Sequence, residues 1–365
     1  MSEWQTFCLK DLVKIFGGST PPTNNPKNYG NKIRWITAKD LSTLQGRYIK
    51  KGSRSISRLG FKSCSTFLLP KHAILFSVRA PIGYTAIISK RSCTDRGLMG
   101  LVPNKKIYFE FLYYLLKYHK DNISNMGVGT TFKGISKPAL GLFKVKIPPT
   151  YYEQQKIART LSVLDQKIEN NHKVNELLHT FAYKIYEYYF KYKPKNAKLE
   201  QIIIENPKSS IMVKNAQKTQ DKYPFFTSGD NILSYPKAII DGRNCFLNTG
   251  GNAGIKFYVG KASYSTDTWC IGANEFSDYL YLLLSSIKTH INQSFFQGTS
   301  LKHLQKNLLK KYPIYMPSAH EIKKFNQIIM PLLTLISINT RTSKKLEQIR
   351  DFLLPLLLKQ QVKPQ

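Results

Sequence analysis

The chain has 365 residues and is 42% hydrophobic, which is enough to build the cores of two or three domains. Its 55 lysines and arginines against 22 acids give a formal net charge of +33 at pH 7. A lysine-rich coding bias would explain the lysines but not the scarcity of acids, and a polyanionic partner explains both. The five cysteines never fall as C-x-x-C, which argues against a zinc site or a disulfide framework and predicts a reduced cytoplasm. We expect no signal peptide and no membrane span.

Residues 1–150 predict a module of short strands with few helices, an α+β arrangement. A short helical pattern from Leu9 to Phe16 stops at Gly17-Gly18, and the segment Ser19-Thr-Pro-Pro-Thr predicts a loop of fixed shape. The later elements, in chain order, are strands at 33–37, 73–78 and 85–89, a helix at 109–118, a loop at 127–133 and a strand at 142–147.

A basic stretch follows the first of these strands. It holds six cations with no acid between them, namely Arg47, Lys50, Lys51, Arg54, Arg58 and Lys62. A solvated loop is the plain interpretation of such a run. Six like charges repel one another unless phosphate is near, so the stretch also fits contact with a nucleic acid backbone.

The stretch from Glu153 to Tyr192 carries a long periodic pattern. Its repeated positions alternate at spacings of four and three residues, which is a heptad seam and predicts a helix about 60 Å long. The seam residues are Ile157, Leu161, Leu164, Ile168, Asn171, Asn175, Leu178, Ala182, Ile185 and Tyr189. An amphipathic surface helix is the alternative, whereas two asparagines inside the seam are typical of a coiled coil with a fixed register.

The same pattern returns 168 residues later in the chain. The repeated positions are Glu321, Phe325, Ile329, Leu332, Ile336, Asn339, Ser343, Leu346, Arg350 and Leu353. Phe111-Leu-Tyr-Tyr-Leu-Leu and Tyr279-Leu-Tyr-Leu-Leu-Leu hold the same offset, as do Pro149 and Pro317. One offset across three features indicates a tandem duplication, in which each unit is a globular module followed by a long helix.

Pro194 ends the first long helix, so the second module is expected from 194 to 317. Its segment from Cys245 to Ile255 matches the hairpin expected from Ile74 to Tyr84. The glycines of this segment, Gly250-Gly-Asn-Ala-Gly, favour a turn over a cofactor loop because no helix follows them.

We find no motif that would make the chain an enzyme. It lacks the Asn/Asp-Pro-Pro-Phe/Tyr motif of adenine methyltransferases and the G-x-x-x-x-G-K-[ST] phosphate loop of translocases. His172 and His179 lie seven residues apart on the first long helix, but no third ligand is placed to join them. They are better interpreted as surface or seam residues, and we expect neither a metal nor a cofactor.

Four further motifs span nearly the whole chain. They are Leu12-x-x-Ile-Phe-Gly-Gly-Ser-Thr-Pro, Trp35-Ile-Thr-x-x-Asp-Leu, Pro148-Pro-x-x-Tyr-Glu-Gln-Gln-Lys-Ile-Ala-x-x-Leu-x-x-Leu-Asp-x-x-Ile, and Leu346-x-x-Ile-Arg-Asp-Phe-Leu-Leu-Pro-x-Leu-Leu. Together they resemble the specificity subunit of type I restriction-modification systems. The second copy departs from the pattern, since Glu321-Ile-Lys-Lys replaces Glu153-Gln-Gln-Lys and Pro331 stands in place of Val163, which allows a kink or a shortened second helix.

The resemblance implies that each α+β module is a target recognition domain and that the two long helices separate the modules. Because duplicated units usually pair by a pseudo-two-fold, we expect the modules to be related in this way and the helices to pack as an antiparallel coiled coil. The expected boundaries are 1–150 for the first module, 151–193 for the first helix, 194–317 for the second module, 318–358 for the second helix and 359–365 for a basic tail. Each module would recognise one half of an asymmetric bipartite site on double-stranded DNA.

The helices would set the spacing and dock two methylation subunits, through which restriction subunits join. The chain would then be non-catalytic and would direct adenine methylation or restriction by its partners. A stand-alone methyltransferase or nuclease and a protein-binding scaffold are the alternatives.

DNA-contacting residues are expected in both modules. The phosphate-contact candidates are Arg47, Arg54, Arg58, Lys62, Arg79 and Lys133 in the first module and Lys214, Lys218, Lys222, Lys256 and Lys302 in the second. The base-contact candidates are Thr130, Thr131, Phe132, Asn248 and Thr299.

The two seams also predict a register. If their polar centres meet in antiparallel packing, Asn171 faces Ser343 and Asn175 faces Asn339, so the polar groups can bond across the seam. The apolar layers would then pair Ile157 with Leu357, Leu161 with Leu353, Ile168 with Leu346, Leu178 with Ile336, Ala182 with Leu332, Ile185 with Ile329 and Tyr189 with Phe325. Leu164 opposite Arg350 is the exception, where the arginine stem would cover the leucine and its head would reach solvent.

Overall fold

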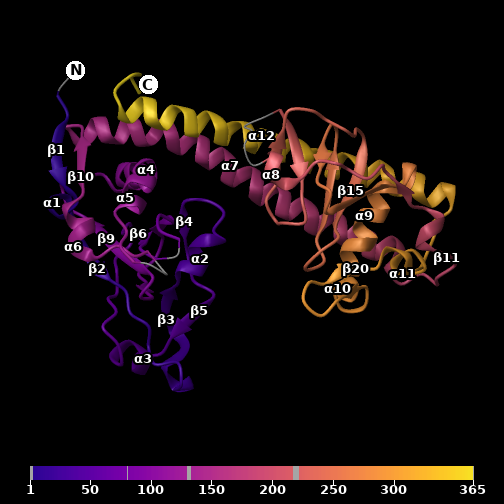
Figure 1. Ribbon diagram of the computed structural model, residues 1–365, viewed down its shortest axis with the longest axis horizontal. Coiled ribbons are helices and arrows are strands. Elements are labelled where there is room, and N and C mark those ends of the chain that lie inside the picture. Colours follow the sequence, from indigo (N-terminus) through magenta and orange to yellow (C-terminus); the bar gives the residue numbers. More distant parts are fainter. Residues whose placement is uncertain (1–2, 80, 130–132, 217–221, 365) are drawn as a thin grey trace. The chain divides into compact units, whose positions relative to one another are not determined.

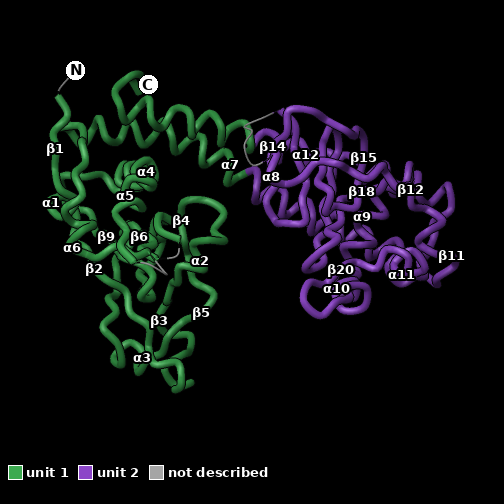
Figure 2. The backbone as a smooth tube through the Cα atoms, in the orientation of Figure 1, with its two compact units in different colours: residues 1–170, 344–365 green, residues 171–343 purple. Residues whose placement is uncertain are grey.

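The computed structural model describes residues 3–79, 81–129, 133–216 and 222–364 (Figure 1). It divides into two compact units. Unit 1 holds residues 1–170 and 344–365, and unit 2 holds residues 171–343 (Figure 2). The long helices α7 (Tyr151–Tyr186) and α12 (Ala319–Leu358) each contribute to both units, so every unit combines a globular module with parts of two helices.

Unit 1 is built on a five-stranded sheet with the strand order β2-β9-β6-β7-β4. Its strands are β2 (Val13–Gly17), β9 (Leu98–Pro103), β6 (Ile74–Ser77), β7 (Thr85–Ile88) and β4 (Tyr48–Ile49), and only the β7–β4 pair is parallel among these neighbours. All of β6 is buried because a core lies on each face of the sheet. Ile74 and Phe76 join one core, and Leu75 joins the other.

A second sheet of unit 1 has the order β5-β3-β8, with β3 antiparallel to β5 and parallel to β8. Its strands are β5 (Arg54–Ile56), β3 (Tyr29–Ile36) and β8 (Cys93–Thr94), and a separate pair joins β1 (Gln5–Cys8) to β10 (Lys144–Ile147). Figure 1 shows β3 and β5 at the end of unit 1 away from α7. The short helices are α1 (Leu9–Leu12), the 3-10 turn η1 (Pro26–Asn28), α2 (Ala38–Ser42), α3 (Arg58–Lys62), α4 (Phe109–Tyr118), α5 (Lys120–Asn125) and α6 (Lys137–Leu142).

Unit 2 repeats this plan. A four-stranded antiparallel sheet, β12-β18-β15-β16, accompanies a three-stranded sheet, β14-β13-β17, in which β13 is antiparallel to β14 and parallel to β17. The strands are β12 (Ile204–Glu205), β18 (Thr268–Gly272), β15 (Arg243–Asn248), β16 (Ile255–Val259), β14 (Leu233–Tyr235), β13 (Tyr223–Phe226) and β17 (Ser263–Tyr264).

The remaining elements of unit 2 complete the module. Two small antiparallel pairs join β11 (Ala197–Lys198) to β21 (Pro313–Ile314) and β19 (Phe296–Gln297) to β20 (His303–Leu304). The helical elements are η3 (Leu199–Gln201), α8 (Val213–Ala216), η4 (Asn274–Phe276), α9 (Ser277–Ser286), α10 (Lys288–Ser294) and α11 (Lys306–Lys310).

The duplication predicted from the sequence is confirmed by these pairings. The antiparallel strands β9, β6 and β7 of unit 1 correspond to β18, β15 and β16 of unit 2, and both three-stranded sheets combine one antiparallel with one parallel neighbour. The expected turn at Gly250 also holds, because β15 and β16 form an antiparallel hairpin in which Gly251 has a φ of +80°. The α+β class is correct for each module.

Both long helices begin at a hydroxyl cap. The Thr150 hydroxyl accepts a hydrogen bond from the Glu153 amide over 3.2 Å, and the Ser318 hydroxyl does the same for the Glu321 amide over 3.3 Å. Glu321 returns a capping-box bond, since its carboxylate accepts from the Ser318 amide over 2.9 Å. A π-helical turn, Glu187–Lys191, follows α7 and places Phe190 in the core of unit 2.

Two local expectations were wrong. The pattern from Leu9 to Phe16 is not one helix, because α1 ends at Leu12 and β2 begins at Val13, where side chains alternate between the two faces of the sheet. The strand expected from Leu142 begins at Lys144, since Leu142 closes α6. Pro331 does not shorten α12, which runs through it. Pro331 and Gln327 are both exposed, so water can reach the carbonyl that loses its helical partner.

Candidate nucleic-acid interface

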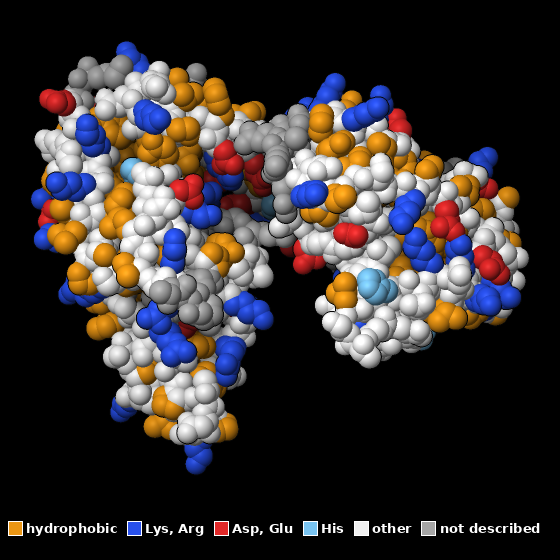
Figure 3. Space-filling view, in the orientation of Figure 1, with side chains coloured by type: hydrophobic (Ala, Val, Ile, Leu, Met, Phe, Trp, Pro, Cys, Tyr) orange, Lys and Arg blue, Asp and Glu red, His pale blue; other side chains and the backbone are white. Residues whose placement is uncertain are grey.

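Most phosphate-contact candidates of the first module are exposed. Lys and Arg side chains are spread over the visible face of unit 1, including the end that carries β3, β5 and α3 (Figure 3). The exposed candidates are Arg54 on β5, Arg58 and Lys62 on α3, Arg79 after β6, and Lys133. Their charges are therefore free to meet a polyanion.

Arg54 is exposed but packs against an aromatic ring. Its guanidinium carbon lies 4.0 Å from the centre of the Tyr29 ring, a cation–π contact. The Tyr29 hydroxyl donates to the carbonyl oxygen of Pro21 over 3.1 Å, and the Trp35 indole donates to the carbonyl oxygen of Ser19 over 3.2 Å. The loop that the glycines and prolines predicted is thus tied to the sheet that carries Arg54, which leaves the planar fork of the arginine oriented for an anion.

Arg47 is a correction to the expected interface. Its side chain is only 3% exposed and pairs with Glu110 over 3.1 Å and Glu169 over 3.2 Å. Its backbone amide also donates to Glu169 over 2.8 Å, and Gly46 has a φ of +111° where a side chain would meet the Glu169 carboxylate. A guanidinium enclosed by carboxylates cannot reach DNA, so Arg47 belongs to the interior of unit 1.

The acids around Arg47 extend this network to both long helices. Glu110 accepts hydrogen bonds from the Tyr48 hydroxyl over 2.6 Å and the Tyr108 hydroxyl over 2.9 Å. Burial, and then these bonds to Glu110, raise the pKa values of both tyrosines. Asp165 on α7 accepts from the Tyr114 hydroxyl over 2.6 Å and from Arg350 on α12 over 2.7 Å. A polar network therefore joins sheet, α4, α7 and α12 within unit 1.

Part of the loop expected to contact bases in the first module lies outside the described residues. Thr130, Thr131 and Phe132 lie outside the described residues. The residues on either side are tied together, because Val128 and Gly134 exchange two backbone hydrogen bonds of 3.0 Å and Gly134 also bridges to Arg79.

The second module keeps some candidates and loses others. Lys214, Lys222, Thr299 and Lys302 are exposed, whereas Lys218 lies outside the described residues. Asn248 is 6% exposed, and its amide nitrogen donates to the carbonyl oxygen of Asn252 over 3.1 Å.

Lys256 is also engaged inside the module. Its ammonium donates to Asn248 over 3.1 Å and to the carbonyl oxygen of Thr227 over 2.8 Å, and burial lowers its pKa. Asn248 and Lys256 therefore bond each other across the β15–β16 hairpin and are removed from the expected interface.

The seam of the two long helices has the predicted register in unit 2. Asn171 donates to the Ser343 hydroxyl over 3.1 Å, Asn339 donates to Asn175 over 2.9 Å, and the rings of Tyr189 and Phe325 lie 6.0 Å apart. Residue numbers rise on one helix as they fall on the other, so the packing is antiparallel. Seam residues in the core of unit 2, buried or packed against it, are Leu178, Ala182, Ile185, Tyr189, Phe325, Ile329, Leu332 and Ile336.

The seam in unit 1 differs from expectation at one layer. Ile157 and Leu161 are buried with Leu353 packed against their core, and Ile168 is buried as well, while Leu164 and Leu346 are half-buried. The guanidinium of Arg350 does not extend into solvent as expected. Its side chain is 14% exposed and pairs with Asp165, because a buried carboxylate one residue beyond Leu164 offers a stronger partner than water.

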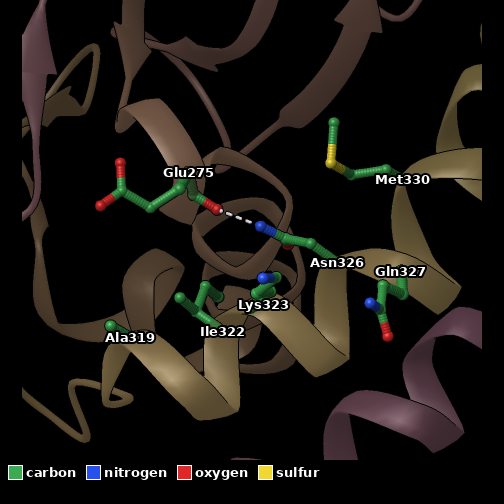
Figure 4. A pocket seen from close by; sticks show the side chains of 7 residues that line it. All are labelled: Glu275, Ala319, Ile322, Lys323, Asn326, Gln327 and Met330. Carbon is green, nitrogen blue, oxygen red and sulfur yellow. Dashed lines mark hydrogen bonds between the residues drawn. The ribbon is translucent and has the colours of Figure 1, made fainter.

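The motif that begins α7 also has a structural role. Gln154 is 1% exposed, accepts from the Tyr108 amide over 2.8 Å and donates to the carbonyl oxygen of Lys106 over 2.9 Å. The second copy has Ile322 at this position, and Asn326 one turn later donates to the carbonyl oxygen of Glu275 over 2.8 Å (Figure 4). In the second copy, the hydrogen bond from the long helix to the module is therefore made one helical turn later than in the first copy.

In the described part of the chain, no group of three or more His, Cys, Asp or Glu side chains could hold a metal, and no helix has the length and apolarity of a membrane span. All five cysteines are described and are free thiols. His179 lies 3.3 Å from the Tyr281 hydroxyl and packs against that ring.

The family described as "Type I restriction modification DNA specificity domain" matches residues 1–180 and 195–348. The chain belongs to this specificity family. The specificity subunit of the type I restriction enzyme MjaIX of Methanocaldococcus jannaschii is 29% identical over 405 positions, which cover 98% of this chain and 93% of that protein. The putative MjaX specificity subunit of the same organism is 32% identical over 187 positions, covering 50% of this chain and 41% of the relative.

A solved structure supports the fold. The crystal structure of the type I restriction-modification S subunit from Mycoplasma genitalium matches with a TM-score of 0.63 at 17% identity, covering 97% of this chain and 96% of that one. The α+β modules and paired long helices are therefore the fold of a specificity subunit.

Two surfaces of this specificity chain escaped sequence reasoning. Lys32 and Arg34 are exposed on β3, and their alternation with Ile33 and Trp35 is the signal that would have found them. The second surface is an apolar stripe outside the seam. On α7 and the following turn within unit 2 it holds Val174, Leu177, Phe181 and Tyr188, and on α12 within unit 2 it holds Ile328, Leu335 and Ile338. Spacings of three, four and seven residues mark it.

Proposed function

We propose that this chain is the DNA-recognition subunit of a type I restriction-modification complex. Its modules, residues 1–150 and 194–317, each recognise one half of an asymmetric bipartite site. The long helices, residues 151–193 and 318–358, set the gap between the halves, and residues 359–365 form a basic tail. The observation that carries the proposal is the duplication of one α+β plan within a chain of net charge +33.

The exposed residues of the modules suggest two kinds of contact with DNA. Exposed cations on β5 and α3, with Lys222 immediately before β13, supply sequence-independent attraction to the phosphate backbone. Arg54, held over Tyr29, is the side chain best oriented for a directed contact. The modules share a frame and differ at these surfaces, which suits two readers of different half-sites.

The helices have a second task in this proposal. An apolar stripe on α7 and α12 remains exposed outside the seam, including Leu177 at 70% and Phe181 at 54% exposure. Exposed apolar patches of this kind mark protein–protein contacts. The partners are two methylation subunits, which carry out adenine methylation and through which restriction subunits join. The chain itself is non-catalytic.

The decisive experiment is a methylome comparison. A host carrying this chain with its methylation subunits is sequenced for methylated adenine, with and without the gene for this chain. We expect one bipartite motif that depends on the gene. Exchanging residues 1–150 for another module should change one half of the motif only. A change in both halves would refute independent reading.

A second assay separates the alternatives. The purified chain is mixed with DNA, with and without S-adenosylmethionine, and then with methylation subunits. Methylation or cleavage by the chain alone would show a stand-alone enzyme. Failure to bind DNA even with methylation subunits would show a protein scaffold.

A further inference from the structure

An arginine joins the module of unit 2 to the long helix α12. Arg243 opens β15 and binds Asp278 of α9 with two of its nitrogens. The remaining donors reach α12, where Arg243 donates to the Thr334 hydroxyl over 2.9 Å and to the carbonyl oxygen of Met330 over 3.2 Å. Asp278 lies inside the module, so it aims the guanidinium at the helix.

The sheet edge of unit 2 is attached to the same part of α12. The Val259 amide, at the end of the edge strand β16, donates to the Ser337 hydroxyl over 3.0 Å. Ser337 is 2% exposed and stands one turn after Thr334. The edge strand would otherwise present an unpaired amide.

Unit 1 contains the same arrangement around Arg47. Glu110 of α4 binds the guanidinium from within the module, and Glu169 of α7 receives both the guanidinium and the backbone amide. Arg47 immediately precedes β4, which is the edge strand of the five-stranded sheet. Asp165, one turn before Glu169, lies 3.9 Å from the Arg47 guanidinium.

The acid partners of the two arginines, Glu110 and Asp278, occupy equivalent positions, and so do the helix residues that accept a backbone amide of each module, Glu169 and Ser337; the arginines themselves do not. Asp278 follows Glu110 by 168 residues, and Ser337 follows Glu169 by the same interval, which is the offset of the duplication. Arg47 precedes β4, whereas Arg243 opens β15, a central strand of its sheet. Both modules thus bring an arginine to the same acid position and to neighbouring turns of the long helix, Asp165 and Glu169 on α7 and Met330 and Thr334 on α12.

We propose that Arg47 and Arg243 are positioning residues that fix the orientation of each recognition module on its long helix, and thereby the gap between half-sites that the complex accepts. The inference rests on the proposed function. One base pair of B-DNA shifts a half-site by about 3.4 Å along the axis and about 35° around it. We call the contacts of Arg243 and Val259 with α12, and those of Arg47 with α7, the dock of each module. A module held by a rigid dock accepts one gap between half-sites. A module whose dock is loosened keeps its DNA-contacting surface but accepts gaps one base pair longer or shorter.

The test loosens the dock without disturbing the module. Thr334→Val with Ser337→Ala removes the hydroxyl partners on α12 and keeps the Arg243–Asp278 pair. Complexes with methylation subunits are given DNA whose gap is native, one base pair longer or one shorter. The methylation rate on the altered gaps, relative to the native gap, should rise at least about tenfold in the variant. The half-site bases should stay the same.

Arg243→Met is the stronger variant, and Thr342→Val on α12, outside the dock, is the matched control. If Arg243→Met fails to fold, the double variant decides. Unchanged gap selectivity with a lower melting temperature would show that the dock is only structural and would overturn the inference. Altered half-site bases would overturn it as well. A wild-type complex with no gap preference would instead refute the proposed function.

Discussion

The Asn339 amide donates a hydrogen bond to Asn175 over 2.9 Å, and this bond uses the same two repeat positions as the one between Asn171 and Ser343, with the helices exchanged. Asn339 follows Asn171 by 168 residues, and Ser343 follows Asn175 by 168. Reciprocal contacts of this kind result when two equivalent helix segments pair about a local two-fold. The polar centre of the seam in unit 2 therefore consists of two equivalent hydrogen bonds related by that local two-fold.

Asn175→Leu should destabilise the protein more than the double change Asn175→Leu with Asn339→Leu. The single variant leaves the Asn339 amide without its seam partner, at a cost of about 1–3 kcal/mol, whereas the double variant removes both polar groups. Urea unfolding of the chain measures both. Lys173→Ala, an exposed change on the same helix, serves as the control. Equal losses in the single and double variants would contradict the pairing.

Two arginines of one basic stretch should behave in opposite ways. Arg54→Ala removes an exposed side chain, so stability should change by no more than about 0.5 kcal/mol while the DNA affinity of the assembled complex falls. Arg47→Ala removes a buried guanidinium from the half-buried carboxylates of Glu110 and Glu169 and should cost about 3–5 kcal/mol of stability. Thermal unfolding and fluorescence anisotropy with labelled DNA measure the two quantities. Loss of stability in Arg54→Ala would contradict its assignment to the surface.

The affinity of the assembled complex for DNA should fall steeply with salt. Several phosphate contacts in each module release counterions, and 6–10 such contacts would weaken binding about 10³–10⁵-fold between 50 and 200 mM salt. Titrations at four or more salt concentrations give the slope. Arg58→Ala, on α3, should lower the slope by about one. The half-buried Lys256, whose ammonium is bonded inside the module, is the matched contrast because its replacement should leave the slope unchanged. A flat dependence would show that the charge serves another partner.

The start of α12 should lose stability in acid. The Ser318 amide, and then the Tyr315 hydroxyl, lower the pKa of Glu321 to about 2. A carboxylate whose pKa is depressed in the folded state stabilises it above the unfolded pKa of about 4.3, and this contribution is lost as the pH falls towards 2. The stability difference between wild type and Glu321→Gln should therefore shrink from pH 7 to pH 3. Glu200→Gln, an exposed change, controls for net charge. A difference that grows in acid would refute the cap.

The sequence predicted the helix pairing because the register of a seam depends on residues whose spacing is visible in the chain. It could not separate Arg47 from Arg54, since both lie in one basic run. The difference arises from Glu110 and Glu169, which are 63 and 122 residues away from Arg47 and converge on it only in the folded unit. The same limit applies to Asn248 and Lys256, whose mutual bond closes across a hairpin.

Short elements were the other source of error. Val13 to Gly17 carries apolar residues at spacings that a helix and a strand both allow, and the pairing of β2 with β9 decides between them. Arg350 was assigned to solvent because it stands opposite a leucine in the seam. Its actual partner, Asp165, lies beside the seam, where a heptad pattern alone does not assign contacts.

A disulfide can test the pairing in unit 1, where Leu161 and Leu353 belong to one hydrophobic cluster. Cysteines introduced at these positions, in a chain whose five native cysteines are replaced by alanine, should form a crosslink under mild oxidation. A disulfide requires Cβ atoms about 3.5–4.5 Å apart, so a crosslink forms only between residues that face each other across the seam. Mass spectrometry of the digested chain identifies the joined peptides. The matched variant carries cysteines at positions 161 and 329, because parallel packing would place Leu161 opposite Ile329, which lies in the core of unit 2. A crosslink in that variant, and none between positions 161 and 353, would overturn both the direction and the register of the two helices.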